Sequence, residues 1–131
     1  MTADDGNAGV VQELWLAFER RDFDAARDLL SDDLVVLWPH SGERIVGADT
    51  FIAINRDYPG DWHITIERII AAGDTVVSAV AVRLGETTWR TASIFDLRDG
   101  KINAVTDYWV EAHVEEPPEW RRRLSERQDF R

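Results

Sequence analysis

The sequence predicts an α+β fold in which helices come first and an antiparallel sheet follows. Apolar residues recur at helical spacing as far as Tyr58, whereas from Trp62 they alternate with polar residues at the period of two that is typical of strands. Turns of only two to four residues separate the alternating runs, and such short connections join antiparallel neighbours. A chain of 131 residues is long enough to form one domain with its own core.

The first half of the chain predicts three helices. Val10 to Arg21 is amphipathic, and Asp22 is placed to cap a second helix from Phe23 to Leu30. A third helix is expected from about Ala48 to Tyr58, because the turn sequence Pro-Gly-Asp follows it. The residues expected on the inner faces of these helices are Val11, Leu14, Trp15, Phe18, Phe23, Ala26, Leu29, Leu30, Phe51, Ile54 and Tyr58.

The strands are expected in the middle and second half of the chain. Leu34 to Trp38 is a short apolar run closed by a proline, which suits a strand near a sheet edge. Four longer strands follow, at Trp62 to Ile70, Thr75 to Leu84, Thr87 to Leu97 and Lys101 to Val110.

The register of the last hairpin decides which way Asp107 points. A two-residue turn would pair Phe95 with Ala104, whereas a three-residue loop over Arg98 to Gly100 pairs Thr91 with Asp107 and Trp89 with Trp109. The second register is preferred because it pairs like residues with like. In that register Asp107 faces an otherwise apolar surface.

Composition limits the partners of the protein. The formal charge of −10 and the pI of about 4.6 make nucleic acid and anionic membranes unfavourable partners. The chain has no cysteine, and its three histidines (His40, His63 and His113) are scattered, so neither a disulfide nor a metal site is expected. No run approaches membrane-spanning length, and we expect a cytoplasmic protein.

The two ends are expected to lie outside the main domain. Residues 1–9 are small and acidic, and we expect them to be disordered. The main domain is expected over residues 10–114, and residues 115–131 should form a linker and a short helix. In that helix, Trp120 and Leu124 lie one turn apart and could pack on the body of the protein.

Six tryptophans in a small domain favour an aromatic pocket. We expect it to bind a small hydrophobic or aromatic molecule. The residues expected to line it are Leu14, Phe18, Trp38, Phe51, Tyr58, Trp62, Val80, Trp89, Thr91, Ser93, Val105 and Trp109.

Asp107 is the candidate catalytic residue. A carboxylate held among indole rings loses hydration, so its pKa should rise toward the range that is useful for proton abstraction. Thr91 and Ser93 are the hydroxyl donors expected on the same face. The alternative is structural: Asp107 accepts hydrogen bonds from Thr91 or Asn55 and holds the sheet to a helix.

The order and spacing of several motifs resemble the nuclear transport factor 2-like superfamily, and within it the SnoaL-like branch. The motifs are FDAARDLL at residues 23–30 followed by Asp32-Asp33, Gly47 before the third helix, Gly73-Asp74 in a turn, and residues 95–102 leading into Asp107-Tyr108-Trp109. The resemblance covers residues 10–112 and implies a cone in which a curved sheet and three helices enclose a pocket.

The resemblance also implies a range of functions. Ketosteroid isomerases, limonene-epoxide hydrolases, scytalone dehydratases and SnoaL-type polyketide cyclases act on hydrophobic molecules without a cofactor, other members bind proteins without catalysis, and homodimers are common. In this chain, the positions of the isomerase base and oxyanion donors fall on Trp38, Leu14 and Ser93, so that machinery is absent. The Arg and Asp of the epoxide hydrolases fall on Val80 and Val82, and only their further carboxylate matches Asp107. A cyclase, isomerase or dehydratase with Asp107 as general base, and a non-catalytic binding or association domain, therefore both stay open.

Overall fold

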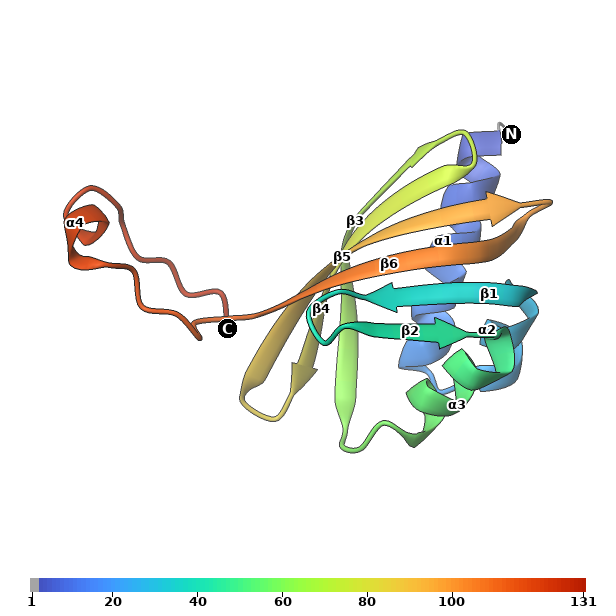
Figure 1. Ribbon diagram of the computed structural model, residues 1–131, viewed down its shortest axis with the longest axis horizontal. Coiled ribbons are helices and arrows are strands. Elements are labelled where there is room, and N and C mark those ends of the chain that lie inside the picture. Colours follow the sequence, from blue (N-terminus) through green and yellow to red (C-terminus); the bar gives the residue numbers. More distant parts are fainter. Residues whose placement is uncertain (1–2) are drawn as a thin grey trace.

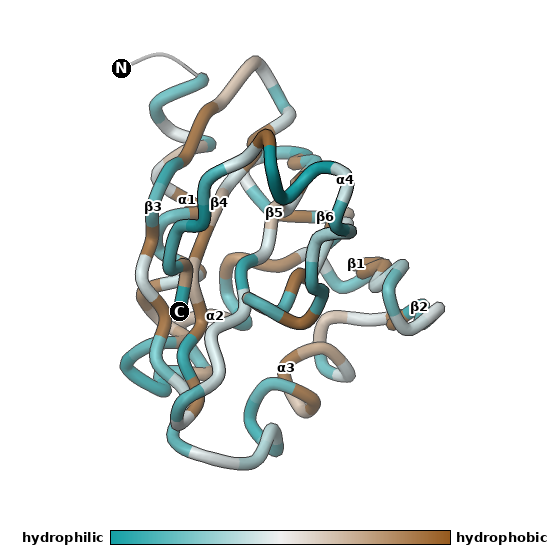
Figure 2. Tube along the Cα trace, turned by 90° about the vertical axis from the view of Figure 1, so that its left-hand side faces the viewer, coloured by the Kyte–Doolittle hydropathy of each residue, from teal (hydrophilic) through white to brown (hydrophobic). Residues whose placement is uncertain are grey.

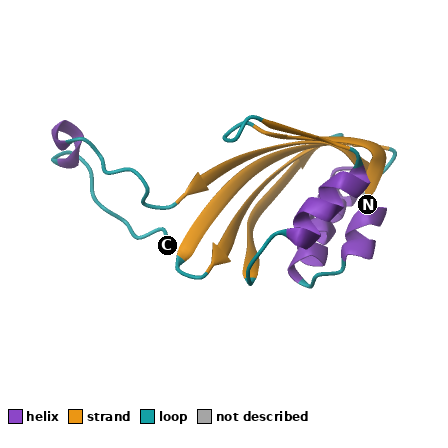
Figure 3. Ribbon diagram, turned by 60° about the horizontal axis from the view of Figure 1, so that its bottom comes forward, coloured by secondary structure: helices purple, strands orange, loops and turns teal. Residues whose placement is uncertain are grey.

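The computed structural model describes residues 3–131 and has two layers, in which three helices lie against the inner face of a curved sheet (Figure 1 and Figure 3). The predicted α+β cone is therefore confirmed. The helices are α1 (Ala3–Glu19), α2 (Phe23–Asp28), α3 (Ala48–Asp57) and a short α4 (Glu119–Arg122). The strands are β1 (Leu30–Trp38), β2 (Glu43–Val46), β3 (Trp62–Ala72), β4 (Thr75–Leu84), β5 (Thr87–Arg98) and β6 (Lys101–Glu111).

Helix α1 starts earlier than predicted. The expectation of disorder over residues 1–9 is wrong from Ala3 onward, while the first two residues lie outside the described part of the chain. Two contacts with the β3–β4 turn hold this first part of the helix: the amide of Gly73 donates to Asp4 Oδ1 at 2.7 Å, and Asn7 Nδ2 donates to the Gly73 carbonyl at 2.8 Å. These contacts join residues far apart in the chain, so local composition does not reveal them.

The six strands form one sheet in the order β2-β1-β6-β5-β4-β3. All neighbours are antiparallel except β1 and β6, which run parallel. The expectation that Leu34 to Trp38 is a strand near a sheet edge is confirmed, because β1 lies next to the four-residue edge strand β2. The strand begins earlier than predicted, at Leu30, which pairs with Ile102 of β6, so the predicted second helix ends at Asp28 instead of Leu30.

The predicted hairpin register is wrong by two residues. Asp99 and Gly100, both with positive φ (54° and 76°), form a two-residue turn, and Asn103 is an extra residue that bulges between Ile102 and Ala104. Ser93 consequently pairs with Asp107. A shift of two residues preserves the face, so Asp107 still points inward, where only 3% of it is exposed.

The β3–β4 pair also contains a bulge. Trp62 pairs with Leu84, and Glu67 is the extra residue that lies between the pairs of Ile66 and Arg68. The β4–β5 pair is regular, with Val82 opposite Trp89 and Val80 opposite Thr91. The hydropathy colours in Figure 2 show that apolar and polar segments alternate along the trace.

The core lies between α1 and the inner face of the sheet. Val11, Leu14 and Phe18 of α1 are buried as predicted, and Trp15 meets Phe95 of β5 edge to face with ring centroids 6.2 Å apart. Asp22 caps α2 as predicted, because its Oδ1 accepts from the amide of Ala25 at 3.0 Å.

Residues 113–131, here called the C-terminal arm, project away from the body (Figure 1, left). The expectation that Trp120 and Leu124 pack on the body is wrong, since they are 64% and 83% exposed. The contacts between the arm and the body involve Phe130 instead, because the Arg90 guanidinium of β5 lies over its ring and donates to its carbonyl. Within the arm, the amide of Phe130 donates to His113 Nε2 at 2.9 Å.

Candidate ligand-binding cavity

A cavity of about 230 Å³ opens at the end of the inner sheet face where β4 turns into β5. Parts of α1 and α3, the β1–β2 turn and strands β3 to β6 surround it, and aromatic side chains predominate among its walls. Its lining residues are Trp15, Phe18, Trp38, His40, Glu43, Phe51, Asn55, Tyr58, Trp62, Ile64, Val82, Leu84, Trp89, Asp107 and Trp109.

The carboxylate of Asp107 borders this cavity and has two neutral hydrogen-bond donors. Ser93 Oγ donates to Oδ1 at 2.5 Å, and the indole Nε1 of Trp38 donates to Oδ2 at 2.8 Å. Burial raises the pKa of Asp107, while these two hydrogen bonds act in the opposite direction and lower it less than burial raises it. Within residues 3–131 no ion pair involves Asp107, so proton transfer to or from it does not require breaking one.

Two features of the sheet bring these three side chains together. The bulge at Asn103 puts Asp107 opposite Ser93 and turns it inward. The parallel pairing of β1 with β6, in which Leu37 is opposite Thr106, carries Trp38 next to Asp107. The expected structural partner of Asp107, Asn55, instead donates to the Phe51 carbonyl within α3 at 2.8 Å.

Most of the predicted lining residues border the cavity, and five do not. Those that border it with Asp107 are Phe18, Trp38, Phe51, Tyr58, Trp62, Trp89 and Trp109. Leu14, Val80, Thr91, Ser93 and Val105 are buried in the core instead, at exposures of 3% or less. The two-residue register shift explains part of this difference, because it moves Val105 opposite Phe95 and away from the open end.

Thr91 does not contact Asp107 directly. Its Oγ1 lies 3.4 Å from Ser93 Oγ, and Ser93 is the residue that reaches the carboxylate. Thr91 therefore belongs to a buried hydroxyl pair behind the carboxylate, and Ser93 acts as a positioning residue.

Sequence reasoning missed seven residues of the lining: Trp15, His40, Glu43, Asn55, Ile64, Val82 and Leu84. Trp15 was expected in the helix core, and its indole N–H does donate inward, to Ser78 Oγ at 3.1 Å. His40 lies in the β1–β2 turn and Glu43 is the first residue of β2, and the His40 ring is 6.4 Å from that of Trp89. The Trp38-Pro39 sequence could have suggested that this turn reaches the cavity.

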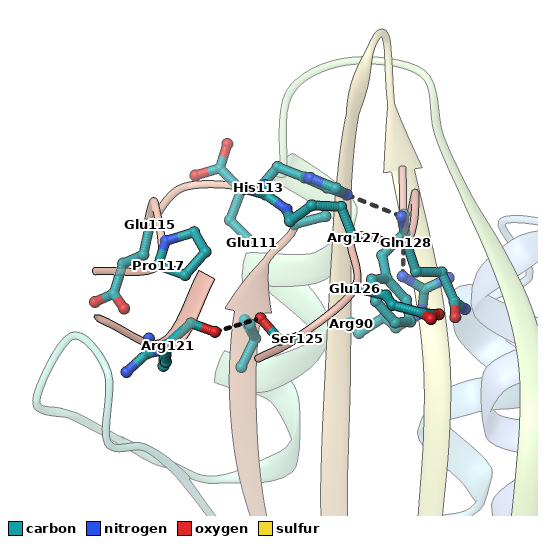
Figure 4. Close-up of a pocket in the computed structure, with 13 residues that line it drawn as sticks. Arg90, Glu111, His113, Glu115, Pro117, Arg121, Ser125, Glu126, Arg127 and Gln128 are labelled. Atoms are coloured by element: carbon teal, nitrogen blue, oxygen red, sulfur yellow. Dashed lines mark hydrogen bonds between the residues drawn. The ribbon is translucent and has the colours of Figure 1, made fainter. Parts of the chain in front are cut away.

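A second and larger hollow of about 470 Å³ lies between the C-terminal arm and the ends of β5 and β6 (Figure 4). Its polar groups contact one another: Arg90 donates to the Phe130 carbonyl, and Ser125 Oγ donates to the Arg121 carbonyl at 3.1 Å. No group there has the burial of Asp107, so the smaller cavity is the better candidate for chemistry.

Within residues 3–131, no helix is long and apolar enough to cross a membrane. In the same range, no three His, Asp or Glu side chains gather closely enough to hold a metal ion.

The arrangement of a curled sheet, three helices and a cavity at the open end defines a cone-shaped domain that is shared by many solved structures. A provisional ketosteroid isomerase from Kribbella flavida is 30% identical, with a TM-score of 0.91 over 98% of this chain and 94% of its own. A protein of unknown function from Burkholderia xenovorans, described as similar to nuclear transport factor 2, is 27% identical, with a TM-score of 0.80 over 95% and 97% of the two chains.

A third structure is similar to this chain in fold alone. A provisional SnoaL-like polyketide cyclase from Jannaschia is 16% identical, with a TM-score of 0.74 over 83% of this chain and 88% of its own. Among curated proteins, none matches.

The model of the SnoaL-like domain family matches residues 11–105, which is most of the chain. This chain therefore belongs to the SnoaL-like domain family, as the sequence motifs predicted. The matched range ends two residues before Asp107, so membership of the family is independent of the candidate catalytic residue.

Proposed function

We propose that this protein binds a small hydrophobic or aromatic molecule in the indole-lined cavity and transfers a proton on that molecule with Asp107, without a cofactor. The observation that carries the proposal is the position of the Asp107 carboxylate, buried at the wall of an open cavity and paired only with neutral donors. The reaction class is an isomerisation, cyclisation or dehydration that begins with removal of a proton next to a carbonyl. Membership of the SnoaL-like family supports this class of reaction.

The environment of Asp107 suits a general base. Desolvation raises its pKa, which increases the affinity of the carboxylate for a substrate proton. Ser93 and Trp38 fix the orientation of the carboxylate, since each holds one of its two oxygens. Each carboxylate oxygen has a second lone-pair direction available for a substrate proton.

A second candidate function is ligand binding without turnover. The observation in its favour is that Val80 and Val82 stand where the resemblance to the epoxide hydrolases would require an arginine and a second aspartate, so those two partners of a catalytic carboxylate are absent. In that case the cavity still takes a small molecule, but Asp107 only anchors it.

Exchange of substrate protons with solvent separates these two functions. The protein is incubated in D₂O with a panel of small aryl ketones, and the loss of the α-proton signal is followed by NMR. Catalysis by Asp107 gives exchange well above the buffer rate, and Asp107→Asn reduces it to that rate. Asparagine fits the site because Ser93 Oγ can accept a hydrogen bond from its amide while Trp38 donates to its oxygen.

Asp96→Asn is the matched control, because Asp96 is an exposed carboxylate of the neighbouring strand and accepts only from Thr75 among the described side chains. If Asp107→Asn exchanges protons as fast as the wild type, Asp107 is not the base. If no ketone exchanges but several bind, the non-catalytic function holds.

We also propose that the protein is a homodimer formed through the outer face of the sheet. Large apolar residues of four strands are exposed there, namely Ile70, Val77, Ile94, Tyr108 and Val110. Ile70, Val77 and Ile94 are cross-strand neighbours in β3, β4 and β5. Exposed apolar residues that gather on one face in this way are typical of a protein–protein contact. Light scattering on a gel-filtration column should give twice the chain mass, and Ile94→Asp should reduce it to one chain mass, whereas a wild type of one chain mass would contradict the proposal.

A further inference from the structure

The cavity is lined by carboxylates but not by lysine or arginine. Asp107 and Glu43 are its acidic lining residues, and no lysine or arginine of the described chain borders it. The chain as a whole carries a formal charge of −10. A cleft lined by acidic groups in an acidic protein concentrates cations and repels anions.

Arg21 carries a positive charge beside a lining residue. Its guanidinium lies over the Trp62 ring, 3.4 Å from the centroid, but Arg21 is not itself part of the lining. Arg21 also donates to the carbonyls of Phe18, Glu19 and Trp62. These contacts hold the charge of Arg21 in the protein wall, so it is not available to pair with an anionic ligand.

The aromatic side chains of the wall provide a second attraction for a positive charge. Eight of the fifteen lining residues are aromatic, and five of these are tryptophans. Three of the five indoles use their N–H inside the protein: Trp15 donates to Ser78, Trp38 to Asp107, and Trp62 to the Tyr58 carbonyl at 3.4 Å. Aromatic faces carry negative charge density and attract organic cations, most strongly when the site is shielded from water.

The volume of the cavity limits the size of the ligand. Drug-sized ligands occupy pockets of roughly 300–1,000 Å³, and this cavity, at about 230 Å³, is smaller. A molecule with one ring and a compact head group is therefore a better fit than one with several fused rings.

We infer that the ligand of this cavity is a small organic cation, a tertiary or quaternary ammonium compound whose head group lies among the indole rings with Asp107 and Glu43 as counter-charges. The inference rests on the proposed function, since it assumes that the cavity binds a small molecule, and it specifies the class of that molecule. In such a complex the ammonium group neutralises the buried carboxylate, a tertiary one by donating its N–H to it and a quaternary one without a direct hydrogen bond. The proton that Asp107 removes in the proposed reaction still lies next to a carbonyl of the same molecule.

Two probes of equal shape test the inference. Phenyltrimethylammonium and tert-butylbenzene differ in one atom and one charge, and their dissociation constants are measured by NMR shift titration of the tryptophan indole N–H signals. The cation should bind at least ~10-fold more tightly than the neutral probe, which is the range expected from cation–π and carboxylate attraction together. Its affinity should fall at high salt, and that of tert-butylbenzene should not.

Single substitutions identify the residue that attracts the cation. Asp107→Asn should weaken binding of the cation at least ~3-fold and leave the affinity for the neutral probe unchanged, because only the counter-charge is lost. The control Asp96→Asn should change neither affinity. Equal or tighter binding of the neutral probe overturns the inference while the ligand-binding function stands. Failure of both probes to bind overturns the inference and the ligand-binding function together.

Discussion

At one end of the inner sheet face, the side chains of β5 and β6 are buried against the helices, whereas at the other end the same two strands border a void. Phe95 and Val105 pair at the packed end and are 1% and 3% exposed. Trp89 and Trp109 lie toward the hollow end, are only half-buried, and border the cavity. Both ends show the same alternation of inward and outward residues, so the periodicity that buries a strand does not decide whether the space above it is filled.

The two ends also differ in the kind of polar group that they bury. At the packed end, Ser78 accepts from Trp15 and so has a neutral partner. At the hollow end, the polar group is an ionisable carboxylate, and its partners are neutral as well. A packed core excludes such a carboxylate, because the cost of burying charge has no compensation there, so its presence beside a cavity indicates a use.

Truncating one aromatic residue at each end is the strongest test of this difference. Phe95→Ala should lower the free energy of unfolding by about 3–5 kcal/mol, because it leaves a cavity against Trp15 in a packed region. Trp109→Ala should cost clearly less, although it removes more atoms, because Trp109 already borders a void. Urea denaturation of both variants measures the two losses, and equal losses would show that the two ends are packed alike.

A smaller loss is expected when the carboxylate loses one donor. Trp38→Phe removes the indole N–H from Asp107 Oδ2 and should lower the free energy of unfolding at neutral pH by about 1–3 kcal/mol. The same change in an Asp107→Asn background should cost less, because a neutral amide needs the donor less than a charged carboxylate does. Equal costs in the two backgrounds would mean that Trp38 stabilises the fold by packing alone.

A pH dependence of stability is also expected. Burial raises the pKa of Asp107 above its ordinary value of 3.8, so between that value and the raised one the folded protein holds more protons than the unfolded chain. The contribution of Asp107 to the free energy of unfolding therefore falls as pH rises through this window, and it is constant below and above it. Asp107→Asn should gain stability relative to the wild type from low to neutral pH in a series of urea titrations, and a wild type that gains over the variant would contradict a raised pKa.

The sequence predicted much of the fold, because local patterns determine most of it. The amphipathic spacing of Val11, Leu14, Trp15 and Phe18 gave the correct buried face of α1, and alternation gave the four long strands. The beginning of α1 and the placing of the arm were missed, since both depend on contacts with distant residues such as Gly73 and Arg90.

For the site, the prediction that Asp107 points inward is correct, but the hairpin register from which it was derived is wrong. A three-residue loop was expected, whereas the structure combines a two-residue turn with a bulge at Asn103, and both arrangements turn Asp107 inward. Bulges have no strong sequence signal, and the parallel pairing that brings Trp38 to Asp107 joins strands 69 positions apart in the chain. The prediction therefore found the carboxylate and not its partner.

The exposed position of Trp120 on the C-terminal arm has a practical consequence for spectroscopy. The other five tryptophans all border the cavity. In a Trp120→Phe protein, every source of indole fluorescence therefore lies at the cavity wall, and emission intensity reports on that wall without a background from the arm. The chain thus contains its own optical probe, and a library of unlabelled compounds can be screened by quenching alone.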